Sequence, residues 1–393
     1  MSMSQLMKAV LLTGHGGMDQ LEHRDDVPVP VPGSGEVLIE VSACGMNNTD
    51  IKVREAQYTV DHDPNGGQDE SASAASISSA DGATSLSFPR IQGGDIVGRI
   101  VKVGAGVDSC RIDQRVLVDF SIYHGRDEQG QPTMDLANVD YIGHGCDGGY
   151  AEYVVVPAAN AHHVTRAISD AELATFGCAT VTAEHMLSRI QLSQGQLVII
   201  TGAGGGVGSA AVQLARARGA RPIALTSRGK EDAILALGAE TCLCRDEYTD
   251  PEGIFQGAAF LAGIERAAGG KHRIDAVIDQ VGGTMFHSLL QTLKPDGHYI
   301  TAGTIAGYTP RVNLHTVYMA FLNIHGSSQG TPADFRRIVE YIEQGSLQPV
   351  LGGTFPLSQL VAAQNAFQTK RHVGNLVIVP DSKWDIYGAP HAA

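Results

Sequence analysis

The chain has 393 residues, of which 43% are hydrophobic, and a formal net charge of −14. The length predicts two domains, and the hydrophobic fraction excludes a chain that is disordered throughout. The acidic balance excludes nucleic acid as an expected partner, because phosphate binding requires a basic surface. No run of about 18 apolar residues occurs, so no membrane-spanning helix and no membrane partner are expected. Six scattered cysteines without a C-x-x-C pair predict a reducing, cytoplasmic location.

Short apolar runs closed by turn residues dominate the first third of the chain and predict β-strands. These runs are 37–41, 98–103, 115–118 and 151–156. Strands of this length with frequent turns predict a partly open barrel. The stretch 61–87 is rich in Ser, Ala, Gly and Asp, and its lack of large apolar residues predicts a long flexible insertion. We expect it to form either a lid or partner-contact loop, or a disordered surface loop.

From about residue 171 the pattern changes to alternating helices and strands. Helices are expected at 171–188, 208–217, 230–237 and 332–343. Strands are expected at 197–201, 222–226, 276–279 and 298–302, and a last strand at 375–379 is expected to return to the first domain. This β-α-β rhythm predicts an α/β domain with a doubly wound parallel sheet.

A glycine-rich loop follows the apolar strand 197–201 and leads into an alanine-rich helix. Glycine lets the backbone turn sharply and approach a pyrophosphate, and the helix N-terminus offers free N–H groups to it. This context predicts a dinucleotide site, against the alternative of a glycine turn without a ligand. The expected contacts are Gly202, Ala203, Gly205, Gly206, Val207 and Gly208.

The residues after the next strand decide between NAD and NADP. An acidic residue about 20 positions past the loop would bind the ribose 2′-hydroxyl of NAD. Ser227 stands there instead, and Arg228 and Lys230 follow it. Two cations near a helix N-terminus are unfavourable without an anion, so we expect NADP(H). The alternative is that both are solvated surface charges.

Taken together, these segments resemble the medium-chain dehydrogenase/reductase superfamily, and within it the zinc-independent quinone oxidoreductase branch. The resemblance covers nearly the whole chain. It implies a GroES-like, partly open β-barrel catalytic domain made of residues 1–169 and 326–393, and a Rossmann NADP(H)-binding domain at 170–325. It also implies a homodimer, formed through the apolar segment His315–Ile324. The motifs that carry it are 45–50, 93–98, 149–153, 182–183 and the glycine loop.

Zinc-dependent alcohol dehydrogenases of this superfamily hold a catalytic metal with Cys, His and Cys. Here Asn47 replaces the first cysteine and Gly94 replaces the histidine, while Cys178 matches the third ligand. A catalytic zinc needs three protein ligands, so we expect none. An unusual set of Cys178, Asp95 and His144 is the alternative, although nothing in the sequence fixes its geometry.

The resemblance also implies roles for particular residues. Asn47 is expected to donate a hydrogen bond to a substrate oxygen and Tyr58 a hydrogen bond or a proton, with Thr49 as a hydroxyl relay and Arg54 between Asn47 and Tyr58. Each of these four has a structural alternative, such as bracing its loop. Thr182 is expected beside the nicotinamide. Further cofactor contacts are expected after later strands, at Ala302, Gly303, Thr304, Gly326 and Ser327.

The leading hypothesis is a zinc-independent, NADPH-dependent oxidoreductase that delivers hydride to a quinone or an α,β-unsaturated carbonyl, a small-molecule substrate. Such acceptors need only hydrogen-bond donors at the developing oxyanion. The alternative is an alcohol or aldehyde dehydrogenase of the zinc type with a degenerate metal site. A third possibility is a dinucleotide-binding protein without catalytic activity.

Overall fold

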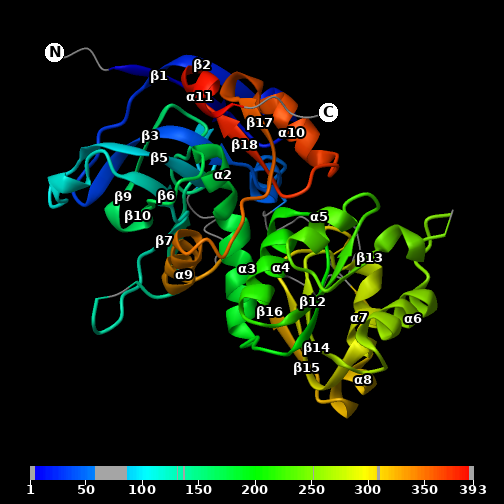
Figure 1. Ribbon diagram of the computed structural model, residues 1–393. Coiled ribbons are helices and arrows are strands. Elements are labelled where there is room, and N and C mark those ends of the chain that lie inside the picture. The colour runs from blue at the N-terminus through cyan, green and yellow to red at the C-terminus, as the bar shows by residue number, and fades with distance from the viewer. Residues whose placement is uncertain are drawn as a thin grey trace, which may run out of the picture. The chain divides into compact units, whose positions relative to one another are not determined.

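The computed structural model describes residues 5–57, 86–130, 132–135, 138–250, 252–307 and 310–388. The chain divides into two compact units, which are described separately (Figure 1). Most of the predicted insertion 61–87 lies outside the described residues. In the part of the chain that is described, no helix is long and apolar enough to cross a membrane. All six cysteines lie within the described residues and none forms a disulfide, while the cytoplasmic location stays a prediction. The first unit comprises Met1–Cys178, Thr331–Val339 and Leu351–Ala393, and the second comprises Ala179–Gly330 and Glu340–Val350.

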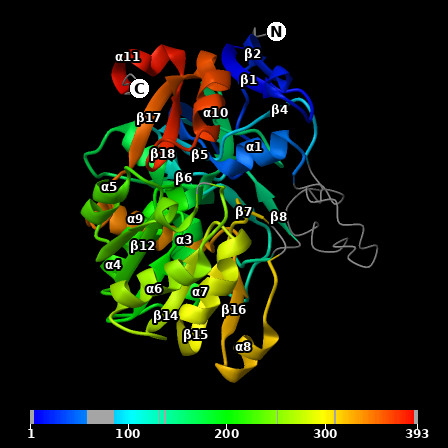
Figure 2. The same ribbon diagram turned by 90° about the vertical axis from the view of Figure 1, so that its right-hand side faces the viewer.

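The first unit is built on a seven-stranded sheet with β3 at its centre. Its order is β10-β6-β5-β3-β18-β17, with β9 also paired to β3. The strand β18 pairs antiparallel with β3, at Val377 opposite Gly45, which confirms the predicted return to the first domain. It lies next to β17 (Figures 1 and 2). The strands are β3 (Glu36–Gly45), β5 (Asp95–Val103), β6 (Arg115–Val118), β9 (Tyr153–Pro157), β10 (Ala161–His163), β17 (Leu351–Pro356) and β18 (Asn375–Val379).

Two smaller sheets and several helices complete the first unit. One sheet has the order β2-β1-β4, and the other pairs β7 with β8. These strands are β1 (Leu6–Leu12), β2 (Leu21–Pro28), β4 (Arg90–Ile91), β7 (Ser121–Tyr123) and β8 (Val139–Tyr141). The helices are α1 (Asn48–Arg54), α2 (Asp170–Leu173), α10 (Leu360–Gln368) and α11 (Trp384–Tyr387), and α9 (Pro332–Glu343) begins in this unit.

The single helix predicted at 171–188 is wrong, because the structure breaks it in two. Helix α2 ends at Leu173, and α3 (Cys178–Arg189) begins after Gly177. The break at Gly177 involves a residue that is distant in the sequence. The carboxyl group of Asp95 lies so close to Gly177 that an added Cβ would overlap it. The same carboxyl group accepts the backbone N–H of Cys178 at 2.7 Å, which fixes the start of α3.

The second unit holds a six-stranded sheet in which all neighbouring strands are parallel. Its order β13-β12-β11-β14-β15-β16 is that of a Rossmann domain. The strand order reverses between β11 and β14, although these two strands are parallel. The strands are β11 (Leu197–Ile200), β12 (Arg221–Thr226), β13 (Thr241–Cys244), β14 (Ile274–Asp279), β15 (Leu293–Thr301) and β16 (Asn323–Gly326). The helices are α4 (Gly206–Ala217), α5 (Glu231–Ala236), α6 (Gly257–Ala268), α7 (Phe286–Thr292) and α8 (Leu314–Met319).

Helices α6 and α7 form a core with one face of this sheet. Phe260 of α6 and Leu289 of α7 belong to the same buried cluster as Ile199 of β11. Because side chains alternate along a strand, the equally buried Val198 and Ile200 point to the opposite face. A sheet that is apolar on both faces needs helices on both, as the α/β class requires.

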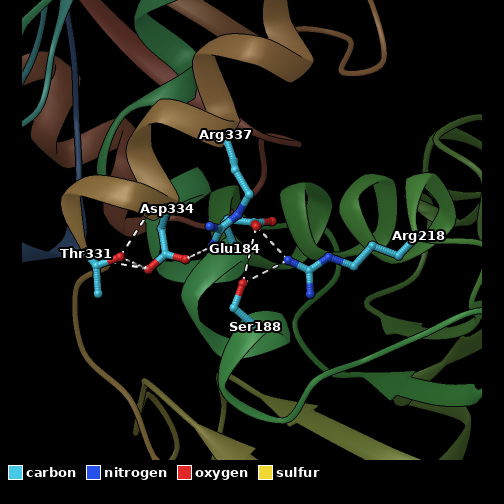
Figure 3. A network of polar contacts seen from close by, with 6 residues as sticks. All are labelled: Glu184, Ser188, Arg218, Thr331, Asp334 and Arg337. Atoms are coloured by element: carbon cyan, nitrogen blue, oxygen red, sulfur yellow. Dashed lines mark hydrogen bonds and ion pairs between the residues drawn. The ribbon is translucent and has the colours of Figure 1, made fainter.

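A buried ion pair joins helix α3 to the end of α4 within the second unit (Figure 3). The Arg218 guanidinium lies 2.5 Å from a carboxylate oxygen of Glu184, which is fully buried, and it also donates to Ser188 Oγ at 2.9 Å. In the first unit, Thr331 and Asp334 cap the start of α9, with the Asp334 N–H donating to Thr331 Oγ1 at 3.1 Å (Figure 3). These contacts fix the end of α4 in the second unit and the start of α9 in the first.

Candidate active site

The glycine loop forms a cradle between β11 and α4. Gly205 caps α4, which begins at Gly206, and Gly202 has a φ of +59°. A side chain on Gly208 would overlap the backbone of Gly202 and Ala203, so only glycine allows the helix to pack this closely on the turn. The free N–H groups of the first turn then face outward from a twelve-residue helix. This geometry fits a pyrophosphate, as the sequence predicted.

A cationic group of three residues, Arg228, Lys230 and Arg245, lies next to this loop, at the carboxyl ends of β12 and β13. The side chain of Lys230 runs across Gly204: an added Cβ there would lie 2.8 Å from Lys230 Cδ and 3.6 Å from Nζ. Burial lowers the pKa of Lys230, and the nearby charge of Arg245 lowers it further. The Arg228 N–H donates to Asp246 Oδ2 at 2.9 Å, and Asp246 also forms an ion pair with Arg245 at 3.1 Å.

Sequence reasoning missed Arg245 in this group. It follows β13 directly, and β13 pairs with β12, so Thr226 lies opposite Cys244 and the two strand ends meet. The strand at 241–244 lacks a motif that marks its end as a ligand contact. Only the parallel register, which places adjacent carboxyl ends at one edge, could have pointed to this arginine.

Of the other predicted cofactor residues, those that end or follow β15 and β16 lie at the same edge of the sheet. Gly303 approaches β14 so closely that an added Cβ would be 2.7 Å from Gln280 O. The Ser327 N–H donates to Thr301 O at 2.9 Å, and among the described residues its buried Oγ has no hydrogen-bond partner. Thr182 is buried on α3. Ala302, Gly303 and Thr304 follow β15, while Gly326 ends β16 and Ser327 follows it.

One buried carboxylate joins the loops at this edge. Asp279, at the end of β14, accepts the hydroxyl hydrogens of Thr201 and Tyr299 and the backbone N–H of Val281 at 2.9 Å. Thr201 leads directly into the glycine loop, and Tyr299 belongs to β15. A single side chain therefore joins β14, β15 and the residue that leads from β11 into the glycine loop.

In the first unit, Asn47 is fixed at two points. Its backbone N–H donates to Asp50 Oδ2 at 2.8 Å, and its side-chain Nδ2 donates to Asp95 Oδ2 at 2.9 Å. Tyr150 OH also donates to Asp50 Oδ2, at 2.8 Å. Burial raises the pKa of Asp50 to about 6 and that of Asp95 to about 7, although the hydrogen bonds to each carboxyl oppose the shift. Asn47 itself is half-buried.

The remaining predicted catalytic residues are placed differently. Thr49 is half-buried in the first turn of α1, two positions after Asn47. Arg54 is 2% exposed, and its guanidinium donates to Gly16 O at 2.6 Å and Gln364 Oε1 at 3.1 Å. Because this guanidinium is engaged within the unit, its position favours the structural alternative, bracing α1. Tyr58 lies outside the described residues.

The residues at the zinc-ligand positions do not fit a zinc ion. Asn47 offers an amide that already donates to Asp95, and both oxygens of Asp95 accept hydrogen bonds. A Cβ at Gly94 would lie 3.1 Å from Phe120 Cβ and 3.2 Å from Ile142 O, so neighbouring atoms leave little space for a histidine side chain here. Throughout the described ranges, no group of three or more His, Cys, Asp or Glu side chains could hold a metal ion.

Comparisons with known proteins agree with this two-part architecture. Residues 33–166 match the alcohol dehydrogenase GroES-like domain, and residues 206–344 match the zinc-binding dehydrogenase domain. The NAD-dependent alcohol dehydrogenase of Sulfolobus acidocaldarius is 28% identical over 95% of this chain and 99% of its own. The acryloyl-coenzyme A reductase of Metallosphaera sedula is 25% identical over the same shares.

A solved structure from Sinorhizobium meliloti 1021, which its name describes as a candidate alcohol dehydrogenase, is more similar. It is 50% identical, with a TM-score of 0.84 over 97% of this chain and 98% of that chain. The fold, the cradle and these relatives define an oxidoreductase that uses a nicotinamide dinucleotide and acts on a small molecule. The chain belongs to the medium-chain dehydrogenase/reductase superfamily.

Proposed function

We propose that the protein is a metal-independent reductase that transfers hydride from NADPH to an activated alkene or a quinone. The observation that carries this proposal is the hydrogen bond of 2.9 Å that Asn47, at a position where zinc-dependent relatives have a ligand, donates to Asp95. An amide and an engaged carboxylate leave the site without a metal ligand set. Oxidation of a simple alcohol without a Lewis acid is difficult, because nothing lowers the pKa of its hydroxyl.

Reduction of a conjugated carbonyl places different demands on the protein. The bound dinucleotide would supply the hydride. Negative charge then develops on the substrate oxygen, and the residues of the chain must stabilise it with hydrogen bonds. Asn47 Nδ2 uses one hydrogen for Asp95 and has a second for this oxygen. Thr49 is the proposed hydroxyl relay, and Tyr58 stays a proposed proton donor.

NADP(H) is the proposed cofactor because cations gather beside the glycine loop. Lys230 lies across Gly204 with a pKa lowered by burial, and Arg245 is close enough to lower it further. Two cations this close repel each other, and an added phosphate would relieve the repulsion. Ser227 leaves room where an acidic residue would reject the 2′-phosphate. We therefore propose that Ser227, Arg228, Lys230 and Arg245 bind it.

The names of the relatives divide between two activities. Acryloyl-coenzyme A, named for the Metallosphaera relative, is an α,β-unsaturated thioester, and this supports an activated alkene as substrate. The alternative, an alcohol or aldehyde dehydrogenase, is favoured by the name of the Sulfolobus relative and by the zinc-binding dehydrogenase match. It requires a metal held by residues such as Cys178, Asp95 and His144. Stoichiometric zinc in the purified protein would support it.

We also propose a homodimer formed through the edge of the second unit's sheet. Strand β16 ends the sheet, and apolar side chains beside it are exposed. A second copy would cover them and the free strand edge. Light scattering should give a molar mass of twice the chain mass for the wild type and of one chain mass for Tyr318→Asp. A monomeric wild type would refute the proposed homodimer. The exposed side chains are Leu314, Tyr318, Met319, Phe321 and Ile324.

Steady-state kinetics with a panel of acceptors test the proposed function. Oxidation of NADPH and of NADH is measured with quinones, enones and aldehydes, each with and without a chelator. We expect turnover of quinones or enones with NADPH, unchanged by the chelator. Turnover restricted to aldehydes and abolished by chelation would support the alcohol dehydrogenase instead. NADPH binding without turnover of any acceptor would support the non-catalytic alternative.

A further inference from the structure

We infer that Asp95 is the positioning residue of the active site, since its carboxylate fixes the Asn47 amide and the first residue of α3 together. The inference rests on the proposed function, because Asn47 contacts the substrate only if that proposal holds. Asp95 is the first residue of β5 and is 0% exposed. Its two oxygens accept from donors that lie 48 and 83 positions away in the chain.

Each oxygen of Asp95 has one donor. Asn47 Nδ2 donates to Oδ2 at 2.9 Å, and the Cys178 N–H donates to Oδ1 at 2.7 Å. Both hydrogen bonds are donated to Asp95 and favour its carboxylate form, and they oppose the burial that raises its pKa to about 7. An asparagine at this position would offer one acceptor and one donor, so it could keep both contacts only if the Asn47 amide reversed and turned Oδ1 toward it.

Glycines on two sides make room for this carboxylate. A Cβ on Gly45 would lie 3.0 Å from Asp95 Cβ and 3.2 Å from Oδ2. A Cβ on Gly177 would overlap the carboxyl carbon. The carboxylate is thus enclosed by backbone, which leaves it few rotamers and fixes the direction in which it holds Asn47.

The consequence for chemistry is the orientation of the Asn47 amide. Because a carboxylate only accepts, Asn47 must turn Nδ2, not Oδ1, toward Asp95. Asp50 holds the backbone of Asn47 from the other side at 2.8 Å, so both ends of the residue are fixed. The hydrogen bond from Nδ2 to Asp95 thus sets the direction in which the second N–H of the Asn47 amide points. Asp95 therefore acts on the substrate oxygen through Asn47.

The experiment compares Asp95→Asn, Asn47→Ala and the double variant on whichever acceptor class the wild type reduces. We expect Asn47→Ala to lower kcat about 100-fold, as removal of an oxyanion donor does. Asp95→Asn should lower kcat about 10-fold or more, with the KM for NADPH unchanged, and the double variant should lose no more than Asn47→Ala. The control is Asp119→Asn, another buried aspartate of the first unit, which should retain kcat.

An exchanged pair, Asn47→Asp with Asp95→Asn, separates positioning from stability. The amide introduced at position 95 could donate to the carboxylate introduced at position 47 and still accept from the Cys178 N–H. We therefore expect the melting temperature to recover from that of Asp95→Asn alone. Position 47 would then carry no side-chain N–H donor, and kcat should stay low.

Three outcomes would each overturn the inference: wild-type kcat in Asp95→Asn, multiplicative losses in the double variant, or restored kcat in the exchanged pair. A wild type that reduces neither enones nor quinones would instead refute the proposed function.

Discussion

The side chain of Lys230 lies across Gly204, so that a Cβ on the glycine would be 2.8 Å from Lys230 Cδ. The half-buried side chain of Lys230 therefore connects the segment after β12 with the glycine loop. The contact explains how a lysine at the start of α5 can serve the cradle before α4. A Cβ at this position would also lie 2.9 Å from Thr226 Oγ1, so a larger residue here would have to displace one of the two side chains.

Gly204→Ala should displace Lys230 and weaken NADPH binding. A hydrogen bond to a charged group contributes about 1.5–3 kcal/mol, so we expect the Kd for NADPH to rise about 10-fold or more. Fluorescence titration measures this directly. In a Lys230→Ala background the contact with the lysine is gone and only Thr226 Oγ1, 2.9 Å from the added Cβ, remains, so the two losses should not multiply. Independent, multiplicative effects would show that the lysine does not act from this position.

Ser227→Asp should reverse the cofactor preference. A carboxylate at this position would accept hydrogen bonds from the ribose hydroxyls of NADH and repel the 2′-phosphate of NADPH. We expect the ratio of kcat/KM for NADPH to that for NADH to fall about 100-fold, the product of two effects of about 10-fold each.

Arg245→Ala should raise the KM for NADPH and leave that for NADH unchanged. An equal loss with both cofactors would place Arg245 outside the phosphate site.

Asp119→Asn should remove a pH dependence of stability. Burial raises the pKa of Asp119 to about 7, above its unfolded value of about 3.9. The folded protein therefore binds more protons between pH 4 and 7, and its unfolding free energy falls as the pH rises through that range. The variant has no titrating group at this position, so it should gain on the wild type by at most about 1.4 kcal/mol for each pH unit. Denaturant titrations at several pH values measure the difference, and a constant difference would contradict it.

Arg218→Met should destabilise the second unit far more than Arg221→Met. Arg218 pairs with Glu184, which is 0% exposed, whereas Arg221 pairs at the surface with Glu240. Loss of a hydrogen bond to a buried charge costs about 1.5–3 kcal/mol, and exposed pairs contribute about 0–1 kcal/mol. Denaturant unfolding of both variants tests this, and similar losses would mean that the buried pair is no stronger than the surface one.

Local patterns were sufficient to predict much of the fold. The glycine loop, four of the six parallel strands of the second unit and the return of the C-terminal strand to the first domain follow from apolar runs and turn residues. Helices α6, α7 and α8 were not predicted. Two of them are only six or seven residues long, and such segments form through packing on the sheet rather than through helix propensity.

Contacts between distant residues could not be predicted. The break at Gly177 depends on Asp95, and the cationic group depends on Arg245 at the end of a neighbouring strand. Arg54 was a catalytic candidate by resemblance, but its neighbours Gly16 and Gln364 come from opposite ends of the chain. Periodicity cannot show such partners, because they are brought together only by the tertiary fold.

The most direct test is to measure zinc content and NADPH-dependent enone or quinone reduction in one purified sample. We predict far less than one zinc per chain and full activity, unchanged after exhaustive chelation. The Asn47–Asp95 hydrogen bond would then hold the position that a metal occupies in zinc-dependent relatives. One zinc per chain, with activity that is lost on chelation and restored by the metal, would contradict the account.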